Sequence, residues 1–77
     1  MISPVYLAAL TAALRAEGLD VEEGAPGPWS CWCMTVRLGC VHDEVMVWAD
    51  EGSVAHAEAV AAEVARLFRQ KMVGVCN

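Results

Sequence analysis

The sequence is poor in basic residues, with 5 lysines and arginines against 10 aspartates and glutamates, so that its formal charge is −5. Proteins that bind DNA or RNA gain much of their affinity from basic side chains that neutralise phosphates. The shortage therefore argues against direct binding of nucleic acid. An acidic surface keeps a small protein soluble, and it also complements a basic surface on a partner protein.

The chain also lacks a long apolar run and a basic leader. A helix that spans a bilayer needs about 20 consecutive apolar residues, and the longest runs here are far shorter. A secretory signal begins with basic residues, and none precedes the apolar segment that ends at Arg15. We therefore expect no membrane association and a cytoplasmic location.

The length of 77 residues leaves room for a single domain, residues 1–77, with a small core. Hydrophobic residues make up 57% of the chain, which exceeds the usual ~45–50%. A domain of this size cannot bury all of them. We expect an exposed apolar patch, and such patches commonly mark a surface that contacts a partner.

Two segments have the periodicity of amphipathic helices. Leucines recur at three- and four-residue spacing in residues 4–17, where Ser3 suits the helix start and Gly18 suits its end. The second segment, residues 53–70, begins with Ser53 as a helix cap and carries its basic residues near the end, as the helix dipole favours. Its expected buried stripe is Val54, Ala57, Ala61, Val64 and Leu67 or Phe68.

The segment between these helices has the alternation of β-strands. Residues 19–23 alternate apolar and acidic side chains, which predicts a short edge strand, and the glycines and prolines of residues 24–28 predict a loop. Residues 29–38 and 41–49 also alternate, and the short link at Gly39 favours an antiparallel hairpin. The expected core side chains of the hairpin's first strand are Trp32, Met34 and Val36, to which Leu7, Leu10, Leu14, Val64 and Leu67 add from the helices.

The element order predicts an α+β fold, in which two helices pack on one face of a small antiparallel sheet of two to four strands. This order, together with Gly52 and Ser53 at the second helix start, resembles a double-stranded-RNA-binding domain. The lysines with which such domains meet phosphate are absent, since Val54, Ala55 and Glu58 stand there. The resemblance therefore implies a similar topology, and the missing lysines argue against binding of RNA.

Cysteine occurs at positions 31, 33, 40 and 76. We expect free, packed thiols, because cysteine is among the most buried residue types and disulfides are rare inside cells. Cys31 and Cys33 share one face of a strand, so an alternative is a metal- or thiol-dependent module that also uses Cys40 and His42. A flat hairpin spreads these side chains apart, which disfavours a tetrahedral zinc site. No metal site and no cofactor are expected.

Acid–base groups occur together at His42, Asp43 and Glu44. Cys33 facing His42 across the hairpin would resemble a nucleophile–base pair. Adjacent strand residues point to opposite faces, however, and no glycine-rich loop or oxyanion donor accompanies them. We therefore expect no catalytic residues and no enzymatic activity.

Together these features predict a small acidic protein-binding module, an inhibitor or adaptor that occupies a basic surface of another protein, such as a surface that binds nucleic acid. Phage-encoded anti-CRISPR proteins, which block bacterial defence, have comparable size and charge. A structural subunit that forms a homodimer through its surplus apolar residues is a further alternative. The expected contact residues are carboxylates at strand ends and loops with one aromatic anchor: Glu22, Glu23, Asp43, Glu44, Asp50, Glu51 and Trp48.

Overall fold

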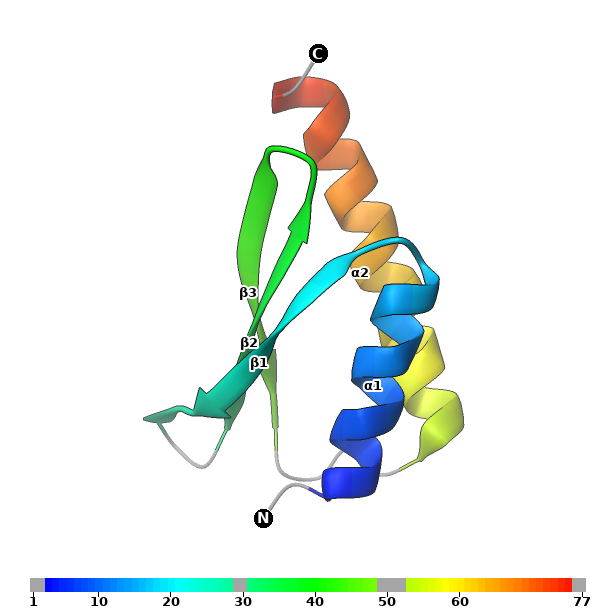
Figure 1. Cartoon of the computed structure of the whole chain (residues 1–77). Helices are drawn as coiled ribbons and strands as arrows, with labels where there is room; N and C mark the ends of the chain where they lie inside the picture. Colours follow the sequence, from blue (N-terminus) through cyan, green and yellow to red (C-terminus); the bar gives the residue numbers. More distant parts are fainter. Residues whose placement is uncertain (1–2, 29–30, 49–52, 76–77) are drawn as a thin grey trace.

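The computed structural model describes residues 3–28, 31–48 and 53–75. Two helices occur in this part of the chain, α1 (Pro4–Ala16) and α2 (Val54–Val75). Figure 1 shows that both lie on the same side of the sheet and that they pack side by side. Neither of these described helices meets the length and hydropathy needed to cross a membrane.

The sheet of the described residues has three strands, β1 (Asp20–Pro26), β2 (Trp32–Leu38) and β3 (Val41–Val47). Both neighbouring pairs are antiparallel, and the order β1-β2-β3 leaves β2 in the centre with an edge strand on either side. The predicted α+β fold, with two helices on one face of a small antiparallel sheet, is confirmed.

Helix α1 begins and ends near its predicted bounds. Pro4 lies in the first turn, where its missing N–H costs no hydrogen bond. Ser3 occupies the predicted N-cap position, but its side chain makes no capping hydrogen bond. At the other end Gly18 has a φ of +89°, and the N–H of Leu19 donates to the Leu14 carbonyl at 3.2 Å. The helix therefore ends in a left-handed turn, which glycine adopts without strain.

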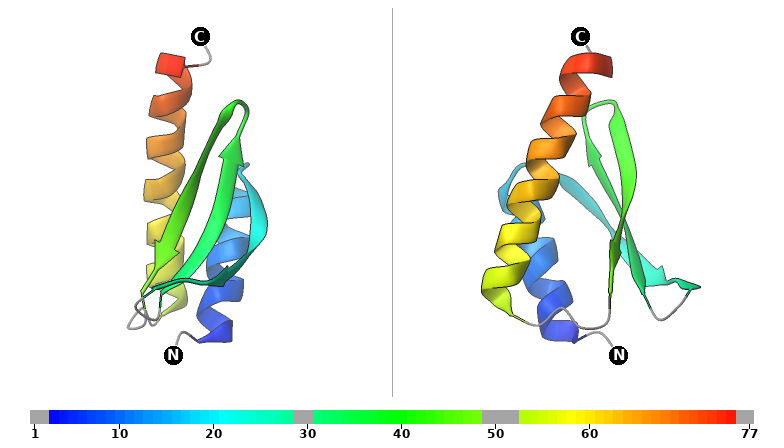
Figure 2. Two further views of the ribbon diagram at one scale, coloured as in Figure 1. Left: turned by 90° about the vertical axis from the view of Figure 1, so that its left-hand side faces the viewer. Right: turned by 180° about the vertical axis from the view of Figure 1, so that it is seen from behind.

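Helix α2 starts at the predicted cap, where the N–H of His56 donates to Ser53 Oγ at 3.0 Å. It continues to Val75, beyond the expected end at residue 70. Figures 1 and 2 show the β2–β3 turn beside the C-terminal half of α2. A Cβ added at Gly39 in this turn would lie 3.3 Å from Met72 Sδ. This packing supports a helix end that local sequence alone does not favour.

Strand β1 is longer than the sequence indicates, because Gly24 and Pro26 belong to it and not to a loop. The register shifts between Glu22 and Ala25, which marks a β-bulge. A proline is tolerated in an edge strand, since one side of that strand needs no ladder hydrogen bond. The glycine and proline therefore occur where the bulge bends the strand, and not in a loop.

The core lies between the helices and the sheet face that they cover. Leu10, Leu14 and Val36 are its largest fully buried side chains. Helix α2 contributes small side chains, which let α1 approach closely, and one aromatic ring. These α2 residues are Ala57, Ala61, Ala65 and Phe68.

Several residues expected in the core are more exposed than predicted. Val54 and Leu67 are 52% and 43% exposed, so they do not belong to the buried stripe of α2. Successive helix residues differ by about 100° in direction, so Phe68 points into the core while Leu67 points away. Partial burial is found for Leu7, Trp32 and Val64.

Candidate partner-binding face

The side of the sheet away from the helices carries several of the side chains expected to contact a partner. Glu22, Thr35 and Glu44 form one row across the three strands, and Cys33 lies opposite Met46. Figure 2 shows that neither described helix covers this side. We call it the outer face. By the alternation of the strands it consists of Asp20, Glu22, Cys33, Thr35, Arg37, His42, Glu44 and Met46, and Trp48, the exposed residue directly after β3, continues this alternation.

Two large apolar side chains stand on the outer face. Met46 is 50% exposed and Trp48 is 45% exposed. A tryptophan combines a large apolar area with one N–H donor, and such side chains often anchor protein interfaces. Sequence reasoning selects Trp48 but omits Met46. The alternation of residues 41–48 places both on one face, and this is the signal that would include Met46.

The acidic residues of the outer face differ in their partners. Glu22 forms an ion pair with Arg37 on the adjacent strand, and both side chains are about half exposed. Glu44 is exposed and makes no ion pair within the described part of the chain. Exposed ion pairs contribute little free energy, so Glu22 can exchange Arg37 for another cation at small cost. Glu44 needs no such exchange.

Asp43 is adjacent to Glu44 in sequence but points to the side of the sheet that faces α2. Lys71 Nζ lies 2.8 Å from Asp43 Oδ2, and the N–H of Glu44 donates to Asp43 Oδ1 at 2.8 Å. The Lys71 hydrogen bond, helped by that N–H, holds the pKa of the Asp43 carboxyl below its ordinary value. Asp43 and Glu44 therefore lie on opposite faces of the sheet, and Asp43 forms a contact within the fold.

Three more of the expected contact residues cannot be placed on this surface. The backbone of Glu23 belongs to β1, but its side chain lies outside what the structure describes. Asp50 and Glu51 lie outside the described residues altogether. Glu22, Glu44 and Trp48 are thus the expected contact residues that lie on the outer face.

Two thiols lie at one end of the outer face. Cys31 Sγ and Cys33 Sγ are 3.9 Å apart, and both cysteines are free. Cys31 is buried and Cys33 is half-buried. Burial, followed by the hydrogen bond with Cys31 and the charges of Cys31 and Glu44, raises the pKa of the Cys33 thiol. A raised pKa keeps the thiol protonated and makes it a poor nucleophile.

The alternative site that joins these thiols to Cys40 and His42 is not assembled. Cys33 pairs with Met46, whereas His42 pairs with Arg37, four residues further along β2. Four residues of strand span about 13 Å, so neither a shared metal nor a Cys33–His42 pair forms. The described residues contain no cluster of three or more His, Cys, Asp or Glu side chains suited to a metal.

Cys40 departs from the expectation of free, buried thiols. It is exposed and disulfide-bonded, and its partner lies outside the described residues. A thiolate ligand is therefore not available at this position. The expectation holds for Cys31 and is nearly met by half-buried Cys33, but it is wrong for Cys40.

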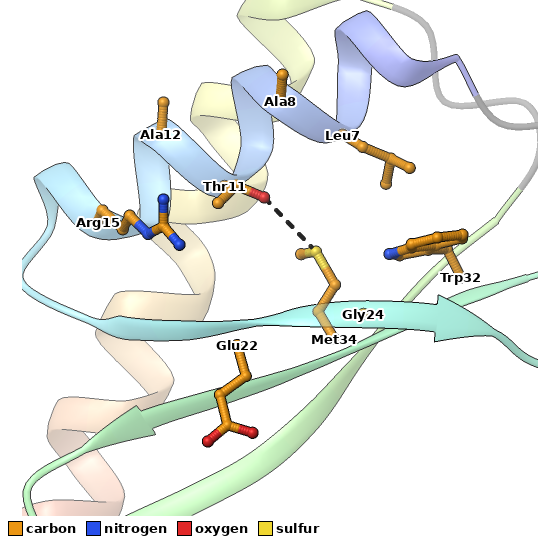
Figure 3. A pocket seen from close by; sticks show the side chains of 9 residues that line it. All are labelled: Leu7, Ala8, Thr11, Ala12, Arg15, Glu22, Gly24, Trp32 and Met34. Carbon is orange, nitrogen blue, oxygen red and sulfur yellow. Dashed lines mark hydrogen bonds between the residues drawn. The ribbon is translucent and has the colours of Figure 1, made fainter.

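A groove of about 440 Å³ lies on the other side of the sheet, between α1 and strands β1 and β2 (Figure 3). Thr11 Oγ1 points to Met34 Sδ at 3.8 Å, and Glu22 points away from the helix. Arg15 donates to the backbone carbonyl of Val21 at 3.3 Å. The groove brings no acid and base together for catalysis. Its lining residues are Leu7, Ala8, Thr11, Ala12, Arg15, Glu22, Gly24, Trp32 and Met34.

No family model, no curated protein and no solved structure matches the chain. Its function must therefore be inferred from its own residues and their geometry.

Proposed function

We propose that this chain is a non-enzymatic protein-binding module, an inhibitor or adaptor whose outer face occupies a basic surface of another protein. The observation that carries the proposal is the position of Glu44. It is exposed, it makes no ion pair among the described residues, and it shares the uncovered sheet face with Met46 and Trp48. A face that carries both a free carboxylate and an exposed aromatic side chain suits a basic, partly apolar surface.

The two kinds of side chain have different roles in binding. Carboxylates attract a basic partner over a distance and mainly raise the association rate, an effect that salt screens. An aromatic anchor that becomes buried mainly slows dissociation, and its truncation costs about 2 kcal/mol or more at a hot spot. The net charge of −5 strengthens the first effect over the whole molecule.

The partner surface in this proposal is one that itself binds nucleic acid. Carboxylates of the outer face then stand where phosphates would bind, and the module blocks access by competition. A phage-type inhibitor of bacterial defence is one biological form of this activity. A cytoplasmic location belongs to the same proposal.

Differential capture from a host lysate tests the proposal while the partner is still unidentified. Tagged wild-type protein, Glu44→Lys, Trp48→Ala and Glu58→Lys are used to capture proteins from the same lysate. Glu58 is an exposed carboxylate on α2 and provides a charge-matched control away from the outer face. We expect a specifically captured protein to be retained by wild type and Glu58→Lys and lost with both outer-face variants. A partner that all four proteins retain equally contradicts the proposal.

A homodimer remains the second candidate, because α2 carries exposed apolar side chains. Leu67, Met72 and Val73 are 43%, 36% and 72% exposed on the C-terminal part of this helix. A second copy packed there would bury them. Light scattering separates the candidates, since a dimer that Leu67→Glu converts to a monomer supports this alternative, and a wild-type monomer excludes it.

A further inference from the structure

The Sγ atoms of Cys31 and Cys33 lie close together, which their spacing in the sequence does not establish. The two Sγ atoms lie 3.9 Å apart, although Cys31 precedes the first residue of β2. Two thiolate–metal bonds of about 2.3 Å place their sulfurs about 3.8 Å apart at a tetrahedral angle and about 4.6 Å apart in a line. A disulfide requires about 2.05 Å. The observed separation suits a bridging metal ion and would have to shrink by almost half for a disulfide.

A third sulfur lies opposite this pair. Met46 is the cross-strand partner of Cys33 and stands on the same face of the sheet. Side chains at directly opposed positions have Cβ atoms about 4.5–5.5 Å apart, which brings the flexible thioether within reach of a site at Cys33. Thiolate and thioether ligands favour soft ions such as Cu(I), whereas zinc in structural sites takes four nitrogen, oxygen or thiolate ligands.

The backbone at Gly27 closes the other side of the thiol pair. A Cβ added there would lie 2.6 Å from Cys33 Sγ and 2.8 Å from Cys31 Sγ. These distances are too short for any side chain, so glycine is required for the sulfurs to keep their positions. The Gly27 N–H also donates to the Cys31 carbonyl at 2.8 Å, which fixes this segment against the thiols.

We propose that Cys31 and Cys33, with Met46 as a third ligand, form a binding site for a soft monovalent metal ion, Cu(I). On binding, the two S–H bonds break, both protons pass to solvent and two copper–sulfur bonds form. The Met46 thioether donates a lone pair and loses no proton. Copper remains in the +1 state throughout, so the step needs no oxidant or reductant.

The test is a competition for Cu(I) between the full chain and a coloured Cu(I) chelator, without oxygen and with ascorbate as the reductant. We expect one Cu(I) per chain and an X-ray absorption spectrum with sulfur ligands only. Cys33→Ser should weaken binding more than the roughly 10–100-fold typical of changes outside the ligand shell. Met46→Leu should weaken Cu(I) binding by about tenfold or more, at the low end of that range.

Gly27→Ala tests the geometry while retaining every ligand, and it should weaken Cu(I) binding by about 10–100-fold. Gly74→Ala is the matched control, since a Cβ at Gly74 meets nothing within 4 Å, and it should bind as wild type does. Circular dichroism of each variant confirms that it is folded. The proposal is overturned if folded Cys33→Ser or Gly27→Ala binds Cu(I) like wild type. It is also overturned if Zn²⁺ occupies the site and Cu(I) fails to displace it.

This proposal stands apart from the partner-binding function. Cys31→Ser, at a buried side chain that is not part of the outer face, should remove Cu(I) binding and leave capture of the partner intact, while Trp48→Ala should have the opposite effect. Failure in one assay therefore leaves the other result interpretable.

Discussion

Neighbouring residues of this chain acquire different roles because a strand turns successive side chains to opposite faces. Asp43 points to α2 and binds Lys71, whereas Glu44 points to the outer face and makes no ion pair in the described structure. Sequence alone groups both with five other contact residues, because acidity and position in a strand are the only signals. The position of Lys71 on α2 decides which of the two carboxylates forms an ion pair.

The Asp43–Lys71 contact should give the stability of the fold a dependence on acid. Because the folded pKa of Asp43 is lowered, its contribution is complete above its ordinary pKa of about 3.9 and is lost as the pH falls through the lower folded value. Both side chains are half exposed, so the contribution should stay below about 1 kcal/mol. Urea unfolding of wild type and Asp43→Asn at pH 7 and at successive values below pH 4 measures it.

Asp43→Asn should be less stable than wild type at pH 7, and the difference should shrink as acid protonates the wild-type carboxyl. Glu58→Gln serves as the control, because Glu58 is exposed and makes no ion pair in the described structure. A constant difference between Asp43→Asn and wild type at every pH would show that the ion pair does not stabilise the fold.

Among the secondary-structure elements, β1 shows most clearly where sequence patterns fail. Its glycine and proline are typical of a loop, yet Gly24 lies in the bulged strand beside Trp32. A Cβ at Gly24 would lie 2.3 Å from the Cys33 carbonyl oxygen and 2.4 Å from Trp32 Nε1. Glycine is required here by a close approach between strands, which a single sequence does not reveal.

Gly24→Ala should therefore destabilise the domain by about 1–3 kcal/mol, because the backbone of β2 and the Trp32 ring must both move. Gly74→Ala should do the reverse, since it lies inside α2 with open space around its Cα and alanine favours a helix by about 0.5–1 kcal/mol. Urea unfolding followed by tryptophan fluorescence compares the two variants. Equal stability of Gly24→Ala and wild type would show that the contact at the bulge is not tight.

The helices are more predictable than the strands because their signals are local. The leucine spacing of α1, the left-handed Gly18 and the Ser53 cap each depend on residues within a few positions of one another. The end of α2 depends instead on packing of Met72 against the distant β2–β3 turn. Likewise, the closeness of Cys31 to Cys33 depends on Gly27 across the intervening segment, so spacing alone underestimates this pair.

Over the whole molecule, one face of the sheet is covered by both helices and the other is not covered by either (Figures 1 and 2). The covered face holds the core, with Leu10, Leu14 and Val36 at its centre. The uncovered face carries Glu22, Glu44, Met46 and Trp48, and its composition is acidic and partly apolar. This division between a structural face and an available face is the basis of the proposed binding function.

The most direct test is surface-plasmon-resonance kinetics with the captured partner immobilised, at several salt concentrations, for wild type, Glu44→Lys, Trp48→Ala and the control Glu58→Lys. We expect Glu44→Lys to slow association more than the control and to reduce the salt dependence, and Trp48→Ala to speed dissociation by about 30-fold, which corresponds to about 2 kcal/mol. If the association rate does not change with salt concentration, and both outer-face variants bind like the control, the outer face is not the binding surface.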